Sequence, residues 1–125
     1  MSMSNLSVWT ARTKFGEKGL TKSNISDIFY QLAVNDEDFN GNNGDEYRWE
    51  ETEMNGFENN CDYLVHTLLK DIADDEILGY SEVRTLIDKF LEGWTYNDNY
   101  YDGIDFTFED ENNVLFVAVA VMYGG

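Results

Sequence analysis

Apolar residues recur at helical spacing in three segments of the chain. The segments span residues 25–33, 61–72 and 83–94, and their apolar positions repeat at intervals of three and four. Ser81 precedes the third segment as a candidate N-cap, and Gly93 comes near its end. Because only one face of each segment is apolar, we predict three amphipathic helices that pack against another layer.

The C-terminal third of the chain predicts a β-hairpin. Ile104, Phe106 and Phe108 alternate with polar residues, which is typical of a strand with one apolar and one wet face. A polar turn at residues 110–113 leads into residues 114–122, which are all apolar. Such a run indicates a central strand covered on both faces, or one whose second face is a subunit interface.

Two weaker strand candidates complete the predicted fold, at residues 6–12 and 46–53. The expected class is α+β, with a three- to four-stranded, mostly antiparallel sheet and about three amphipathic helices packed on one face. A length of 125 residues fits a single domain spanning residues 1–125, and we find no interdomain linker.

Charge is distributed very unevenly along the chain. Residues 1–22 form a basic N-terminal segment, with four basic residues against Glu17 alone, whereas residues 23–125 carry 24 acidic residues against four basic ones. The formal net charge of the whole chain is −17. A net charge of about 2 to 8 keeps a small domain soluble, and a larger excess adds self-repulsion. The excess therefore indicates a basic partner.

Motifs for nucleophilic, nucleotide or metal chemistry are weak. Cys61 and His66 are the only residues of their types, and their five-residue separation rotates them about 140° apart on a helix. One cysteine and one histidine are too few for the usual zinc sites, and the chain has no GxGxxG or Walker loop. We expect no enzyme and no cofactor, with Cys61 in the core and His66 partly buried.

One partial metal motif begins after the first predicted helix. Asp36, Asp38, Asn40 and Gly41 have the spacing that opens an EF-hand loop, but Tyr47 stands where the bidentate glutamate belongs. A solvated loop is the simpler interpretation, and we assign no metal ligand. A small calcium-binding module is kept as a further alternative.

The acidic surface is the candidate binding site. Some twenty charges correspond to about 34 Å of duplex DNA axis, and a compact domain of this length has a diameter of roughly 36 Å. If the acidic clusters share a face, that face carries about as much negative charge as DNA of equal length. The predicted partner-binding residues are Asp36, Glu37, Asp38, Asp45, Glu46, Glu50, Glu51, Glu53, Asp74, Asp75, Glu76, Asp98, Tyr100, Tyr101, Asp102, Glu109, Asp110 and Glu111.

In size, charge and segments such as TYNDNYYDG (residues 95–103), the chain resembles the small acidic DNA-mimic proteins of phages and mobile elements. These proteins inhibit restriction enzymes, CRISPR effectors or other nucleic-acid-binding proteins. The resemblance is one of composition over the whole chain. It implies a non-enzymatic inhibitor that blocks the cationic nucleic-acid-binding groove of a host defence protein and does not itself bind DNA. An immunity protein that neutralises a basic nuclease-type toxin has a similar composition and is the alternative.

The sequence also predicts a cytoplasmic protein, in the host cell if a phage encodes it, with no membrane association. The start of the chain lacks the basic and apolar regions of a signal peptide, and one cysteine cannot form an internal disulfide. The longest apolar run, residues 114–123, is about half the length of a membrane-spanning helix. The same run allows a homodimer.

Overall fold

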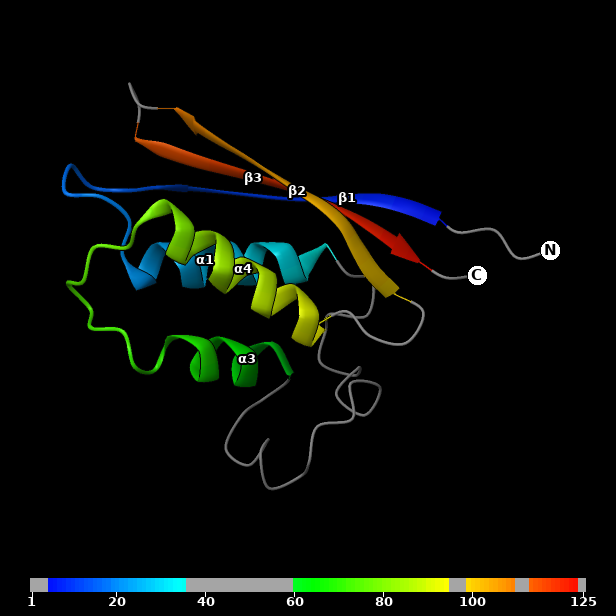
Figure 1. Cartoon of the computed structure of the whole chain (residues 1–125), viewed down its shortest axis with the longest axis horizontal. Helices are drawn as coiled ribbons and strands as arrows, with labels where there is room; N and C mark the ends of the chain where they lie inside the picture. The colour runs from blue at the N-terminus through cyan, green and yellow to red at the C-terminus, as the bar shows by residue number, and fades with distance from the viewer. Residues whose placement is uncertain (1–4, 36–59, 95–98, 110–112, 124–125) are drawn as a thin grey trace.

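A computed structural model describes residues 5–35, 60–94, 99–109 and 113–123. The fold is α+β, with three helices that lie on one side of an antiparallel sheet (Figure 1). The predicted class is therefore confirmed, while the strand predicted at residues 46–53 lies outside the described residues. In chain order the elements are β1 (Asn5–Lys14), α1 (Lys22–Val34), α3 (Asn60–Leu69), α4 (Tyr80–Trp94), β2 (Asn99–Glu109) and β3 (Val114–Tyr123).

The sheet has the order β1-β3-β2, and both neighbouring pairs are antiparallel. The predicted hairpin is confirmed as the pairing of β2 with β3, and its turn contains Asn113 at a φ of 51°. Asparagine is among the few non-glycine residues that adopt this left-handed conformation readily. The register of β2 shifts between Tyr101 and Gly103, which marks a β-bulge. Among the described strands, β3 therefore lies between β1 and β2.

The core lies between the sheet and the helices. Leu115, Val117 and Val119 of β3 are fully buried, whereas the positions between them are only half-buried. On β1, Trp9 and Ala11 are buried in the same alternating way. Successive strand residues project to opposite faces, so the buried positions define the face that packs on the helices.

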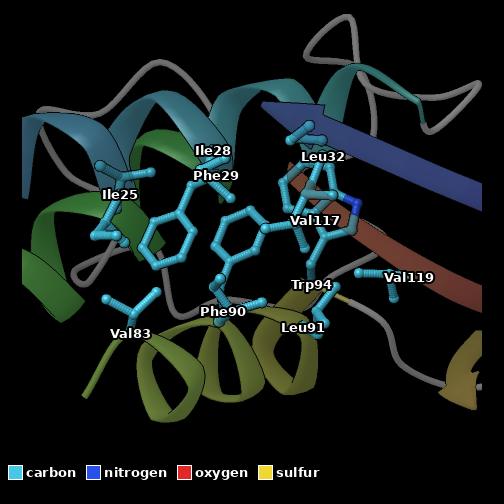
Figure 2. Packing of buried hydrophobic residues seen from close by; sticks show 14 of the residues in the cluster. Ile25, Ile28, Phe29, Leu32, Val83, Phe90, Leu91, Trp94, Val117 and Val119 are labelled. Atoms are coloured by element: carbon cyan, nitrogen blue, oxygen red, sulfur yellow. The ribbon is translucent and has the colours of Figure 1, made fainter. Parts of the chain in front are cut away.

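An aromatic stack joins α1 to α4 at the centre of this core (Figure 2). The rings of Phe29 and Phe90 lie 4.4 Å apart between centroids and 4° from parallel. The ring of Trp94 follows one helical turn later, 6.1 Å from that of Phe90, and all three side chains are fully buried. The regularly spaced apolar residues of α1 and α4 therefore form one continuous contact between the two helices.

The boundaries of the helices differ in two places from the sequence prediction. α3 ends at Leu69, although the apolar spacing continues to Ile72, so the last predicted turn is a loop. Ser81 lies inside α4 and is not its N-cap, because the helix already begins at Tyr80. The amide of Gly79 instead donates to a side-chain oxygen of Glu82 at 3.3 Å, which satisfies one free donor at that helix end.

The outer edge of β1 is occupied by amide side chains of α1. The Arg12 backbone N–H donates to Gln31 Oε1 at 3.0 Å, and Gln31 Nε2 donates to the Arg12 carbonyl at 2.8 Å. One side-chain amide thus pairs with both backbone groups of a strand residue, as a neighbouring strand would.

Asn24 of α1 and the C-cap residue Asn35 extend this contact along β1. Asn35 Nδ2 donates to the Thr10 carbonyl at 3.3 Å, and Asn24 Nδ2 donates to the Lys14 carbonyl at 3.0 Å. An edge strand normally presents such groups to any other strand. The helix therefore closes this edge of the sheet to strand addition along residues 10–14.

Candidate functional site

One predicted acidic cluster is described in full, in the loop that joins α3 to α4. Asp74, Asp75 and Glu76 are all exposed, and the side chain of Asp74 is 94% exposed. The Glu76 amide donates to the Ala73 carbonyl at 3.1 Å, so the three carboxylates occupy a tight turn. They are presented together at the apex of the loop.

The loop is anchored to the body of the protein at its C-terminal end. Leu78 is buried, and its amide donates to the Leu20 carbonyl at 2.8 Å. At the N-terminal end, Ile72 is partly buried against the core. Because Ile72 and Leu78 fix both ends of the loop, the short segment between them restricts where its three carboxylates can lie.

A contact with the basic N-terminal segment neutralises part of this cluster. Lys22 Nζ lies 3.0 Å from Asp74 Oδ1. Since Asp74 is almost fully exposed, the pair contributes at most about 1 kcal/mol to stability. Asp75 and Glu76 carry the charge that the loop presents beyond this pair.

The sequence prediction missed one acidic member of the same loop. Asp71 is exposed and lies three positions before Asp74. The apolar spacing up to Ile72 predicts a helix that includes Asp71. A single acidic residue on the solvent-exposed face of a helix does not indicate a binding site. A helix end at Leu69 would have placed it in the cluster.

Four other predicted site residues are placed by the backbone of β2. Tyr100 pairs with Met122, Tyr101 pairs with Val121, and Asp102 falls at the bulge between Tyr101 and Gly103. Adjacent strand positions alternate between faces, so the two tyrosine positions do not share a face of the sheet. The register therefore separates two of the predicted partner-binding positions onto opposite faces of the sheet.

Glu109 occupies the other end of β2, opposite Val114. The remaining predicted residues lie outside the described part of the chain, and so does the partial calcium motif at residues 36–41. Those remaining site residues are Asp36, Glu37, Asp38, Asp45, Glu46, Glu50, Glu51, Glu53, Asp98, Asp110 and Glu111.

The bounds of the helices and strands show which segments of the chain carry the excess negative charge. Residues 36–59, between α1 and α3, contain nine acidic residues and only Arg48 as a basic one. Residues 95–112, which include β2 and precede β3, contain six acidic residues and no basic one. The rest of the chain has ten acidic and seven basic residues. Nearly all of the net charge thus lies in two stretches, and the helices with β1 are close to neutral.

The carboxylates outside those two stretches all contact solvent. Asp62 and Asp88 are half-buried, and the other eight are exposed. Asp62 Oδ1 accepts a hydrogen bond of 2.6 Å from the Tyr30 hydroxyl, which joins α3 to α1. These carboxylates can therefore attract a basic partner electrostatically. Asp62 also links α3 to α1 through its hydrogen bond with Tyr30.

A cavity of about 380 Å³ lies beside the acidic loop, between α1 and α3. Its lining includes Lys22 and Lys70 together with His66 and Asp74. His66 is exposed, which corrects the expectation of a partly buried residue. The cavity therefore contains two lysine ammonium groups and the Asp74 carboxylate that pairs with one of them, Lys22.

Cys61 is fully buried in the core, as predicted. Burial, reinforced by the negative charge of Asp62, raises the pKa of the Cys61 thiol to about 12. Very little thiolate forms near neutral pH, so this group is a poor nucleophile.

We expect iodoacetamide to modify Cys61 at least about a hundredfold more slowly in the native protein than in urea, at about pH 8. Mass spectrometry of timed samples measures both rates. Because the folded-state pKa lies above that of a free thiol, the stability that this group contributes should be lost as the pH rises from about 9 toward 12. Equal modification rates in the two states would contradict the buried position.

Within the described ranges, no three histidine, cysteine or acidic side chains are grouped so that they could hold a metal ion. Of the helices in those same ranges, none has the length and apolar character needed to cross a membrane. No protein-family model, curated protein or solved structure matches the chain.

Proposed function

We propose that this protein is a non-enzymatic acidic inhibitor that occupies the cationic nucleic-acid-binding groove of another protein, as a DNA mimic does. The observation that carries the proposal is the confinement of the net charge to two stretches, while the rest of the chain is nearly neutral. A charge needed only for solubility would be spread with both signs interspersed over the surface. Concentration of one sign favours a binding surface.

The amount of charge is suited to this role. Residues 36–59 and 95–112 together carry fifteen carboxylates against one guanidinium. That excess equals the phosphate charge along about 24 Å of duplex DNA. The predicted sheet of three to four strands is part of the proposal, since its fourth candidate, residues 46–53, contains Glu50, Glu51 and Glu53.

Binding would replace phosphate contacts by carboxylate contacts. Lysine and arginine side chains of the target would pair with Asp and Glu of this chain, which speeds encounter and makes binding sensitive to salt. The loop bearing Asp74, Asp75 and Glu76 would add to the same field, and its fixed ends limit the ordering cost on binding. The proposed target is a host defence protein of the restriction or CRISPR type, met in the cytoplasm.

The proposal can be tested with the full-length chain immobilised on beads. We expect nuclease-treated lysate from a host with restriction and CRISPR systems to yield a nucleic-acid-binding protein that is retained at about 50 mM salt. Duplex DNA should release it, and the free chain should inhibit DNA binding by the purified target. Recovery of a single nuclease-type toxin would favour the immunity protein, and retention of nothing at low salt would exclude both functions.

Two triple variants separate a localised site from net charge alone. D74K/D75K/E76K reverses the described cluster, whereas a control variant reverses Glu17, Asp27 and Glu92, which are exposed and scattered. Both variants have the same net charge. We expect the cluster variant to weaken binding to the captured target about tenfold or more beyond the control, with thermal stability unchanged or higher. Equal weakening would show that the loop is not part of the site.

A further inference from the structure

The sheet has an outer face that the helices do not cover. All three described helices lie on the opposite side of the sheet (Figure 1), and α1 and α4 are the two that contact its strands. On the outer face of β3, the residues are again apolar, with Phe116, Ala118 and Ala120 half-buried. An antiparallel sheet that faces water normally alternates apolar with polar residues, so the second apolar face needs another explanation.

The strands on either side of this apolar row carry opposite charges. In the ladder, Val114 lies between Lys14 of β1 and Glu109 of β2, and Ala118 lies between Thr10 and Asp105. Arg12 and Lys14 are both exposed on β1. At the register positions of the outer face, β1 is therefore basic and β2 is acidic, with an apolar row between them.

We propose that a second copy of this chain packs on the outer face, around a two-fold axis parallel to the strands. Such an axis places β3 on β3 and β1 on β2 of the partner, at the same level along the strand. Lys14 of each copy then lies over Glu109 of the other, and Arg12 lies between the levels of Glu109 and Asp105.

The charges select this axis over the alternative. A two-fold axis in the sheet plane but perpendicular to the strands would place β1 on β1 of the partner with the strand direction reversed. Lys14 and Arg12 would then lie over the opposite end of that strand and would meet no acidic position of β2. Only the axis parallel to the strands sets basic positions against acidic ones, which favours that axis. An apolar centre with a polar, charged rim is also the usual anatomy of a protein interface.

The size of the face limits the strength of this dimer. With strands ~4.8 Å apart and ~3.4 Å per residue, the outer face measures about 480 Å². Stable dimers bury roughly 800 Å² per partner, so we expect a reversible dimer that forms at micromolar concentrations. The inference concerns the sheet and does not depend on the proposed inhibitory function.

Sedimentation velocity of the full-length chain between roughly 1 and 200 μM tests the proposal. We expect the wild-type protein to shift from monomer to dimer over this range. Lys14→Glu and Glu109→Lys should each weaken the dimer about tenfold or more, because each change sets like charges against each other twice per dimer. A monomer at every concentration would overturn the proposal and assign the face to other segments of the chain or to a different partner.

Mixing the two single variants provides a matched control. The mixture should restore the dimer, because each copy of one variant then meets an opposite charge on the other at both contacts. The double variant K14E/E109K should dimerise like the wild type for the same reason. Failure of both combinations to restore association would overturn the proposed axis, and circular dichroism establishes that each variant is folded.

Discussion

Replacing Val117 by aspartate should leave the chain unfolded in water. Val117 is fully buried at the middle of the central strand, within the apolar cluster that the helices cover. Burying an ionised carboxylate there without a partner costs several kcal/mol or more, which is comparable to the whole stability of a small domain, about 5 to 15 kcal/mol. Far-UV circular dichroism and the fluorescence of the buried Trp9 and Trp94 report the loss of structure.

The neighbouring residue supplies a matched control. Ala118→Asp introduces the same side chain into the same strand, but on the half-buried outer face. This variant should fold with a loss of about 1 kcal/mol, because aspartate is disfavoured in strands, and it should fail to dimerise. If V117D instead melts like the wild type, Val117 does not face the core.

Replacing Phe90 by alanine should lower the free energy of unfolding by about 3 to 5 kcal/mol. Phe90 is fully buried and stacks on Phe29 at 4.4 Å, so the change removes a large side chain from the contact between α1 and α4. Loss of the stacking geometry adds to the effect of the cavity. Urea unfolding followed by circular dichroism measures the change, which should appear in the midpoint with little change in slope.

Two control variants test whether the loss of stability comes from the buried ring of Phe90. Phe90→Leu keeps much of the apolar volume and should cost about 1 to 1.5 kcal/mol. Thr85→Ala changes an exposed residue of the same helix and should leave stability within about 0.5 kcal/mol. A loss of less than about 1 kcal/mol for Phe90→Ala would show that the two helices do not pack through this ring.

The helices and the hairpin could be predicted because their signals are local. The apolar positions of residues 25–33 and 83–94 fall within α1 and α4, and the alternation at residues 104–108 falls within β2. The end of α3 was missed because the core reaches beyond Leu69: Ile72 packs against it from a loop and so imitates one more helical turn.

The partner of β1 could not be predicted from the sequence. Pairing depends on contacts between residues more than a hundred positions apart, such as Trp9 with Val119, and no local pattern encodes them. The role of Gln31 was hidden for a related reason. A polar residue on an amphipathic helix normally indicates the wet face, whereas this one binds the backbone of a strand.

The candidate site was only partly predictable. Asp74, Asp75 and Glu76 were identified as a surface cluster because consecutive acids cannot all be buried, and all three are exposed. The pairing of Lys22 with Asp74 joins segments about fifty residues apart, so it required the fold. For the second face of β3, the sequence left a covering layer and a subunit interface as alternatives, and the described helices all lie on the other face.

The amide side chains along β1 also protect that strand from other molecules. Gln31, Asn24 and Asn35 occupy backbone groups of β1 along residues 10–14. A strand of another molecule could add at this place only by displacing all three side chains. A helix that covers one strand therefore protects this part of the sheet from edge-to-edge aggregation.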